Sequence, residues 1–353
     1  MQPTLCAEYN GTVGGTWYPP TAERPGYHFE PPCELIRPTV HAVRSCLADR
    51  HLLFFGDSLQ RYMYLTLANF IVSGEWPEDS KIRSPWYENT YFAESLPEDE
   101  KWLRYFEDTN AQLTGHEVCD CWREDCCQES HLHENRYMRV GNAAVSFVSQ
   151  MVGPDWAPHG SVAPGSWEAM RAGIMCAPGR CNVSNADGHR TPRWRTSITN
   201  FMRATLPKLG VTDVLLNLGG HHWSVQHRTP LVEQIFDAAQ HGASRRVWVR
   251  TTTPRHKGDL SATSRMGFAL REEAVTMAAA RRGLGILDMM GIMMALKGVR
   301  DKREKEGAFV DGVHLQCSVN RELLIVLLNQ LCDPELLRLR RGEGRGAAAR
   351  TKT

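Results

Sequence analysis

One stretch of the chain constrains the fold more than any other: residues 51–72, HLLFFGDSLQRYMYLTLANFIV. It opens with an apolar run from His51 to Phe55 that stops at Gly56, and apolar residues then recur at helical spacing from Leu59 to Ile71. This order predicts a buried strand, a tight turn and a helix. Such a unit belongs to an α/β fold, in which the turn lies at the carboxyl end of the strand.

Ser58 is the residue of chemical interest in this turn. It would lie on the first turn of the predicted helix, where free backbone N–H groups and the positive end of the helix dipole can stabilise a developing oxyanion. Ser58 is therefore a candidate nucleophile. Asp57 and Ser58 are also common helix caps, so the tripeptide Gly-Asp-Ser alone does not decide between the two roles.

The composition is that of an ordinary globular protein that can bury a full core. The chain has 353 residues, of which 42% are hydrophobic and 23% charged, and its formal net charge is +1. This balance argues against a nucleic-acid partner, because basic residues form a run only in a Gly/Ala-rich tail at 338–350. No apolar stretch reaches the roughly 20 residues that span a bilayer.

The cysteines favour an oxidising compartment. The chain has eleven cysteines, six of which lie in two clusters, at 119–127 and 176–181. Glycosylation sequons begin at Asn10 and Asn182. We therefore expect several disulfides, with at least one cysteine left over. Residues 1–30 lack the pattern of a signal peptide, so we expect that the targeting or anchor segment of a secretory protein would be absent from this chain.

Two inferences concern particular cysteines. Cys317 and Cys332 bracket a predicted helix about 20 Å long, which is too far for a disulfide between them. A zinc site built from the 119–127 cluster with His131 and His133 is an alternative to disulfides there, although the spacing matches no standard zinc-finger pattern.

The chain divides into a lead-in, a body with one long insertion, and a tail. Residues 1–47 carry three cysteines among Gly, Pro and aromatic residues. This composition predicts an irregular segment that is attached to the core through its cysteines. Residues 48–335 form the body, with an insertion at about 74–138 whose Trp and Tyr rings either stack on sugars or pack on the core. Residues 336–353 predict a basic, disordered tail.

Strands alternate with helices after the insertion. Apolar runs predict strands at 143–148, 211–218, 246–250 and 285–288, and helical periodicity predicts helices at 194–209, 231–239, 266–280 and 319–331. This alternation implies a central parallel sheet covered on both faces, with one site at the carboxyl ends of its strands.

A first polar cluster, NLGGHHW at 217–223, leaves one of these strands. The side-chain amide of Asn217 and the backbone N–H of Gly219 are donors of the kind that an oxyanion hole requires. Asn217 could instead simply end the strand.

A second cluster, DGVHL at 311–315, precedes the last helix. Asp311 can orient the imidazole of His314, which can then take the proton of Ser58. The pair could also be a helix-start feature without chemistry. The order Gly-Asp-Ser, Asn-x-Gly, Asp-x-x-His at three element boundaries favours the chemical reading, and the lack of a G-x-S-x-G motif disfavours an α/β-hydrolase.

The blocks GDSLQRY, NLGGHHW and DGVHL together resemble the signature blocks of the SGNH (GDSL) hydrolase superfamily. With Arg61 and VRTTTPRH at 249–256, the chain is more closely similar to the PC-esterase group. This group includes plant trichome-birefringence-like polysaccharide O-acetyltransferases and the luminal domain of sialic-acid O-acetyltransferases. The resemblance covers roughly residues 6–332 and implies an SGNH-type three-layer α/β fold.

The resemblance implies a triad of Ser58, Asp311 and His314, with Asn217 as an oxyanion donor. An extra residue in the second block means that either His221 or His222 matches the family histidine. Candidates for substrate binding from the resemblance are Arg61, Gly153, His221, His222, Trp223, Arg250 and His256. The third block departs from the plant members and is nearer to the sialic-acid-modifying branch, so the sugar is not assigned.

The function that we expect is serine-dependent transfer of an O-acyl group, foremost acetyl, onto carbohydrate hydroxyls in the Golgi lumen or outside the cell. The acceptor would be a glycan or polysaccharide, and the donor acetyl-CoA or another acetylated compound. We expect no metal, no tightly bound cofactor and a monomeric protein. An O-acetyl esterase with the same triad and a non-catalytic glycan-binding protein are the alternatives.

Overall fold

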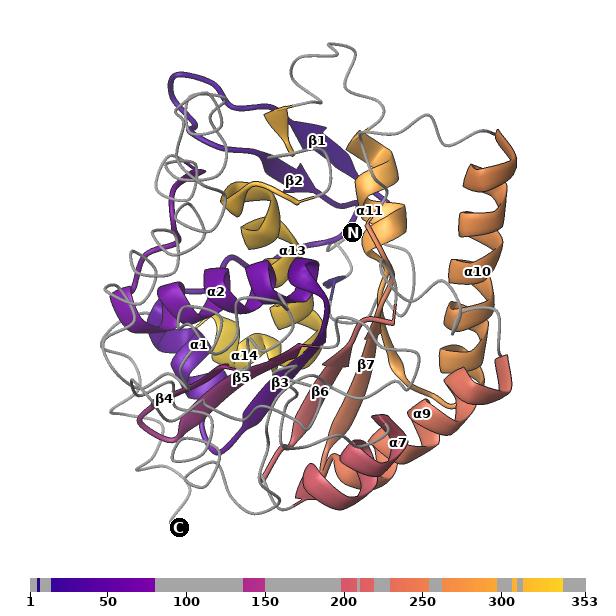
Figure 1. Cartoon of the computed structure of the whole chain (residues 1–353). Coiled ribbons are helices and arrows are strands. Elements are labelled where there is room, and N and C mark those ends of the chain that lie inside the picture. Colours follow the sequence, from indigo (N-terminus) through magenta and orange to yellow (C-terminus); the bar gives the residue numbers. More distant parts are fainter. Residues whose placement is uncertain are drawn as a thin grey trace, which may run out of the picture.

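The computed structural model describes residues 5–6, 14–79, 136–149, 198–207, 210–218, 229–253, 262–296, 307–309 and 314–338. At its centre is a six-stranded sheet in the order β4-β5-β3-β6-β7-β8 (Figure 1). The strands are β4 (Arg136–Val140), β5 (Ala143–Ser149), β3 (His51–Gly56), β6 (Asp213–Leu216), β7 (Arg246–Arg250) and β8 (Gly285–Leu287). β4 is antiparallel to β5, and the other five strands run parallel.

The parallel sheet predicted from the sequence is thus confirmed. In chain order, its five parallel strands lie in the spatial order 2-1-3-4-5, because β5 is added on one side of β3 and β6, β7 and β8 on the other. In a sheet of this order, the direction in which successive strands are added reverses between the first and third strands, and ligands bind outside the carboxyl ends of that pair. Here that pair is β3 and β6.

Helices cover both faces of the sheet (Figure 1). Successive residues of a strand face opposite layers, so Leu52 and Phe54 pack in one core cluster and Leu53 and Phe55 in another. The first cluster includes residues of α1 (Val40–Cys46), α2 (Ser58–Ser73), α11 (Met289–Ala295), α13 (Cys317–Leu331) and α14 (Pro334–Leu337). The second includes residues of α7 (Ile198–Asn200), α9 (Thr229–Gly242) and α10 (Ala262–Arg281). The described part of the chain therefore has three layers.

One predicted helix differs in detail from the structure. The segment expected to be α-helical over 194–209 is described from Ile198, and after Asn200 it continues as a π-helical turn, Phe201–Thr205. Ile198, Phe201 and Met202 are nevertheless buried, as the apolar spacing predicted. The apolar side of this segment is thus buried as predicted, although its backbone hydrogen bonds change from the α-helical to the π-helical pattern.

The N-terminal segment packs on α13. Its strands β1 (Thr16–Tyr18) and β2 (His28–Glu30) form a small antiparallel sheet, and the Phe29 N–H donates to the buried carboxylate of Glu322 at 3.2 Å. Further along, the backbone N–H and carbonyl of Ile36 both bond the side chain of Asn329, at 2.9 and 2.7 Å. Polar side chains of one buried helix thus satisfy the backbone of a segment that has little regular structure of its own.

Two disulfides confirm the expectation that the cysteines pair. Cys6 bonds Cys33 within the N-terminal segment, and Cys46 bonds Cys332 across 286 residues of sequence. Cys317 is a buried free thiol at the other end of α13 from Cys332, as the helix-length argument required. Disulfides of this kind persist in oxidising environments and are compatible with a secreted or lumenal protein. The 119–127 and 176–181 clusters lie outside the described residues.

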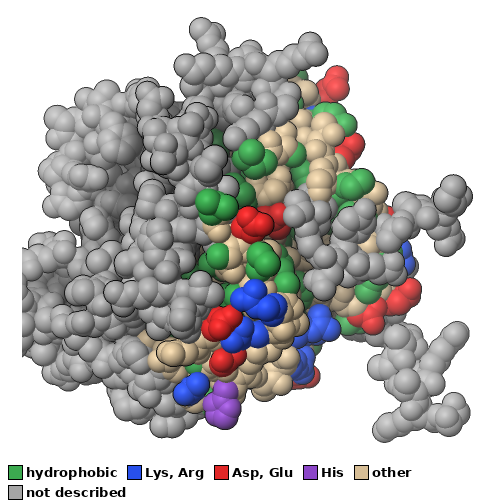
Figure 2. All heavy atoms as spheres, turned by 90° about the vertical axis from the view of Figure 1, so that its right-hand side faces the viewer, with side chains coloured by type: hydrophobic (Ala, Val, Ile, Leu, Met, Phe, Trp, Pro, Cys, Tyr) green, Lys and Arg blue, Asp and Glu red, His purple; other side chains and the backbone are tan. Residues whose placement is uncertain are grey.

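The face formed by α9, α10 and α11 carries mixed charge and a few apolar side chains (Figure 2). Ion pairs join α9 to α10, with Arg281 to Glu233 at 2.9 Å and Arg282 to Asp237 at 2.6 Å. Large hydrophobic side chains also reach the surface of α10 and α11, at Leu270, Met277 and Met294. None of the helices in the described part of the chain is both long enough and apolar enough to cross a membrane.

Candidate active site

The turn between β3 and α2 follows directly from the local sequence. β3 is buried along its whole length, and Asp57 leaves it with extended backbone to become the N-cap of α2, its carboxylate accepting from Leu59 N–H at 3.0 Å. Ser58 is consequently the first residue of the helix rather than its cap. The structure describes Ser58 by its backbone, which lies at the positive end of a 16-residue helix.

Asn217 lies beside this turn, at the end of the neighbouring strand. It follows β6 directly and is fully buried, and its backbone N–H donates to the carbonyl of Phe55 at 2.8 Å. The two chain ends approach closely because residue 56 is glycine. A Cβ atom at Gly56 would lie 3.0 Å from Cβ of Asn217 and 2.6 Å from Cγ of Gln60. Gly56 therefore lets Asn217 and the start of α2 meet at the carboxyl end of β3.

Gln60 holds this arrangement together, and sequence reasoning did not single it out. Its side-chain Nε2 donates to the carbonyl of Leu215 in β6 at 2.8 Å, in a fully buried position. This bond ties the first turn of α2 to the strand that carries Asn217. There is little signal for it in the sequence, because Gln60 lies next to Arg61 in the first turn of the helix, where polar residues are common.

His314 also lies against α2. Its imidazole contacts the ring of Tyr62, with centroids 4.9 Å apart and planes at 45°. Tyr62 comes four residues after Ser58, and residues at this spacing lie on one face of a helix, one turn apart. The guanidinium of Arg61 lies 5.4 Å from the Tyr62 ring centroid and is itself buried. The segment before α13 thus brings the predicted base to the first turns of α2.

Residues 308–309 and 315–316, on either side of His314 in the sequence, lie next to each other. Phe309 forms an antiparallel bridge with Leu315, and the N–H of Gln316 donates to the carbonyl of Ala308 at 3.0 Å. These contacts hold the residues that follow His314 against residues 308–309. Asp311, the predicted third member of the triad, lies between these two segments in the sequence and outside the described residues.

Arg250 brings a buried positive charge to the same edge of the sheet, at the carboxyl end of β7. It is 1% exposed, and its Nη2 donates to Thr253 Oγ1 at 2.9 Å. Burial lowers its pKa to about 10, and the negative charges of Asp57 and Glu272 oppose that shift. Its Nε and Nη1 have no hydrogen-bond acceptor among the residues that the structure describes. Buried N–H groups require an acceptor, so an oxygen of a bound molecule would be stabilised here.

Glu272 was also missed from the sequence. It projects from α10 into the core, is 5% exposed, and accepts a hydrogen bond from the Thr252 N–H at 2.9 Å. It therefore supports the segment that follows Arg250 and supplies part of that side chain's counter-charge. A glutamate within the charged run Arg271–Glu273 of a helix gives little sequence signal, because most such residues face solvent.

The remaining predicted site residues lie outside the described part of the chain. They are Gly153, Gly219, His221, His222, Trp223, His256 and Asp311. The zinc alternative at 119–133 lies there as well. Within the described ranges, no group of three or more His, Cys, Asp or Glu side chains is arranged to hold a metal ion.

No protein-family model matches this chain, and no curated protein matches it as a relative. The assignment of a function therefore rests on the residues at the carboxyl edge of the sheet and on their chemistry.

Proposed function

We propose that the protein is a serine-dependent O-acyltransferase that moves an acyl group, foremost acetyl, onto a hydroxyl of a carbohydrate. One observation supports this best: Ser58 begins α2, Asn217 ends β6 beside it, and His314 contacts Tyr62 one turn further along the helix. A nucleophile, an oxyanion donor and a base are the groups that acyl transfer requires. The proposal assigns them to the carboxyl ends of β3 and β6, the strand pair where a sheet of this order binds its ligand.

In the proposed reaction, the Ser58 hydroxyl attacks the carbonyl carbon of the donor while His314, oriented by Asp311, takes the proton. The oxyanion accepts hydrogen bonds from the Ser58 and Gly219 N–H groups and the Asn217 side-chain amide. The leaving group departs with the proton from His314, and an acyl ester remains on Ser58. His314 then deprotonates a sugar hydroxyl, whose oxygen attacks this ester and takes the acyl group. The Ser58 oxygen leaves and regains its proton from His314.

The proposal also assigns a role to Arg250. Its two N–H groups without a described acceptor would bind an oxygen of the donor or of the sugar. Placement in the Golgi lumen or outside the cell belongs to the same proposal, and it is supported by the two disulfides.

The experiment is to incubate the purified protein with an acetyl donor and a panel of glycans, and to measure acetylated glycan and free acetate together. Wild-type protein should form acetylated glycan, and Ser58→Ala and His314→Gln should each lower the rate roughly 10³-fold or more with the fold intact. Free acetate without acetylated glycan would make the protein an esterase with the same triad. Near-normal turnover by Ser58→Ala would overturn the proposal.

A further inference from the structure

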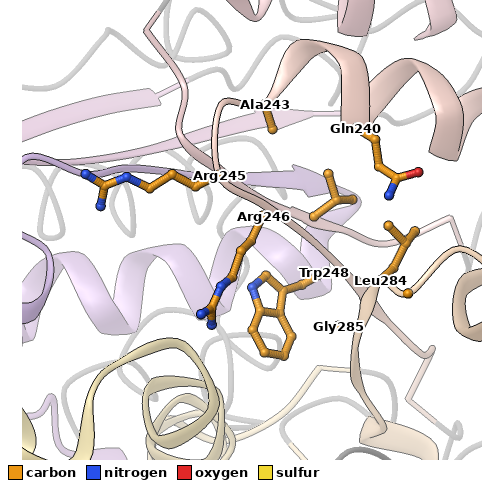
Figure 3. Close-up of a pocket in the computed structure, with 9 residues that line it drawn as sticks. Gln240, Ala243, Arg245, Arg246, Trp248, Leu284 and Gly285 are labelled. Atoms are coloured by element: carbon orange, nitrogen blue, oxygen red, sulfur yellow. The ribbon is translucent and has the colours of Figure 1, made fainter.

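A cavity lies at the opposite edge of the sheet from Ser58, at the amino-terminal ends of β7 and β8. Its volume is about 350 Å³, which is room for a small molecule. It is lined by Gln240 and Ala243 at the end of α9, by residues 245–248, and by residues 283–285 before and within β8 (Figure 3). Along β7, it is separated from the Arg250 end by roughly 13 Å, at about 3.3 Å per residue.

Positive charge gathers around this cavity. Arg245 and Arg246 line it, and their charges also act on Arg50, the residue before β3. Burial lowers the pKa of the Arg50 guanidinium, and the charges of Arg245 and Arg246 lower it further, against the opposing effect of Asp213. The Arg50 guanidinium is thus close enough to Arg245 and Arg246 to be repelled by both.

Asp213 is the carboxylate among these groups, and both of its oxygens are already engaged. Its Oδ1 accepts from Arg50 at 3.3 Å, and its Oδ2 accepts from the Thr212 hydroxyl at 2.7 Å. It lies opposite Arg246 in the sheet register but has no ion pair with it among the described contacts. The described side chains therefore leave an excess of positive charge at this edge.

Two hydrogen-bond donors belong to residues that line the cavity. The indole of Trp248 is 7% exposed, and its Nε1–H has no acceptor among the described residues. Figure 3 shows the guanidinium of Arg246 alongside this indole. The one hydrogen bond described for that guanidinium, to the Gln330 carbonyl, is long at 3.4 Å. A buried N–H next to a weakly engaged guanidinium is an arrangement that an anionic oxygen would satisfy.

The indole is held in place rather than free to turn away. It lies against the backbone of Gly285, where any Cβ atom would overlap the ring. Trp248 also belongs to the main core cluster, packed with residues such as Leu287. The direction of its N–H is therefore set by the fold, as a binding site requires.

We propose that this cavity is a binding site for a small oxyanion, a carboxylate, sulfate or phosphate group, held by the Arg246 guanidinium and the Trp248 indole N–H. The charge of Arg50 and Arg245 favours the same ligand from a greater distance. The remaining volume accommodates a group attached to the anion, such as a sugar ring. The site lies apart from the proposed acyl-transfer centre and does not depend on it.

The test follows the tryptophan indole N–H signals in a ¹H–¹⁵N correlation spectrum while inorganic phosphate is added. Loss of one signal in Trp248→Phe assigns it. We expect that signal to shift in a saturable manner in wild-type protein. Arg246→Gln should weaken phosphate binding tenfold or more, because it removes a charge-assisted hydrogen bond. Trp248→Phe lacks the indole signal, so its phosphate affinity is measured by calorimetry, and it should be about fivefold weaker than in the wild type.

The matched control is Arg281→Gln, which removes the same charge from an exposed arginine paired with Glu233. It should change the phosphate affinity less than twofold. Thermal unfolding of each variant shows whether the fold is retained. If Trp248→Phe is destabilised, Arg246→Gln still tests the site, because it leaves the indole in the protein. Acyl-transfer activity should be the same in all three variants, which separates this proposal from the proposed function.

Further titrations with a sugar phosphate and with a sugar carboxylate identify the source of the anion. Tighter binding of either sugar than of phosphate supports the site and assigns the rest of the cavity to the sugar ring. Equal affinity supports a site for the free anion. Two results would overturn the proposal: no saturable shift of the Trp248 signal, or binding that Arg246→Gln leaves unchanged, which would mean an adventitious ion only.

Discussion

At the scale of single residues, the candidate site depends on a glycine that permits close approach. Gly56 has no side chain where β3, β6 and α2 come together, and so Asn217 and Gln60 can occupy the space around it. Asp57 caps the helix, which leaves Ser58 as its first residue. Each residue of the tripeptide Gly-Asp-Ser thus has its own role. Gly56 allows the close packing, Asp57 caps the helix, and in our proposal Ser58 is the nucleophile.

Asn217→Ala tests the proposed oxyanion hole. A donor directed at charge that develops only in the transition state affects turnover rather than ground-state binding. We expect kcat to fall roughly 10²-fold or more, with KM within a few-fold of wild type. The measurement is steady-state kinetics and thermal unfolding on the same preparation.

Asn329→Ala is the matched control, because this asparagine is equally buried but bonds the backbone of Ile36 in the N-terminal segment. It should lower the melting temperature and leave kcat per folded molecule unchanged. If Asn217→Ala behaves in the same way, Asn217 has only a structural role.

At the scale of elements, Glu322 joins the N-terminal segment to α13. Its carboxylate is fully buried and accepts hydrogen bonds from the side chain of Arg37, at 2.7 and 3.0 Å, and from the Phe29 N–H. Replacement by alanine leaves a buried N–H and a charge without their acceptor. We expect Glu322→Ala to lower the free energy of unfolding by about 3 kcal/mol.

Urea unfolding followed by circular dichroism measures this loss. Glu335→Ala is the control, since its side chain is 87% exposed and pairs with Arg338 only at 3.7 Å. The control should cost less than about 0.5 kcal/mol. Equal effects of the two substitutions would show that the N-terminal segment does not depend on Glu322.

The elements also show what a single sequence reveals. Continuous apolar runs predicted β3, β5, β6, β7 and β8, because buried parallel strands are apolar on both faces. β4, β1 and β2 were not predicted: β4 is an edge strand with polar residues, and β1 and β2 are only three residues long. Short or edge strands are set by their partners in space, which local periodicity does not report.

The same contrast holds within the site. Asn217 and His314 were found because they end or precede predicted elements, whereas Gln60, Tyr62 and Glu272 act from inside helices. Tyr62 was read only as an apolar residue of the helix stripe, and nothing near it in sequence points to an imidazole 4.9 Å away. Such contacts come from tertiary packing.

At the scale of the whole molecule, the Cys46–Cys332 disulfide joins α1 to the end of α13 across 286 residues of sequence. A cross-link that closes so long a loop restricts the unfolded chain more than the Cys6–Cys33 bond, which spans 27 residues. We expect the double replacement of Cys46 and Cys332 by serine to lower the free energy of unfolding by roughly 4 kcal/mol.

The double replacement of Cys6 and Cys33 by serine should cost less, and Cys317→Ala should leave both disulfides intact. Denaturant unfolding under oxidising conditions compares the three proteins. The same midpoint for the Cys46/Cys332 variant and the wild type would show that the long-range cross-link contributes nothing to stability.

The central claim is that Ser58 is a nucleophile activated by His314, and covalent labelling tests it most directly. The protein is treated with a fluorophosphonate, which phosphonylates activated serines, and the adduct is located by intact-mass and peptide mass spectrometry. The account predicts one phosphonyl group per chain, on Ser58, absent from Ser58→Ala and formed at least about 10²-fold more slowly in His314→Gln. Labelling of Ser58→Ala at the wild-type rate, or no labelling of folded wild-type protein, would contradict it.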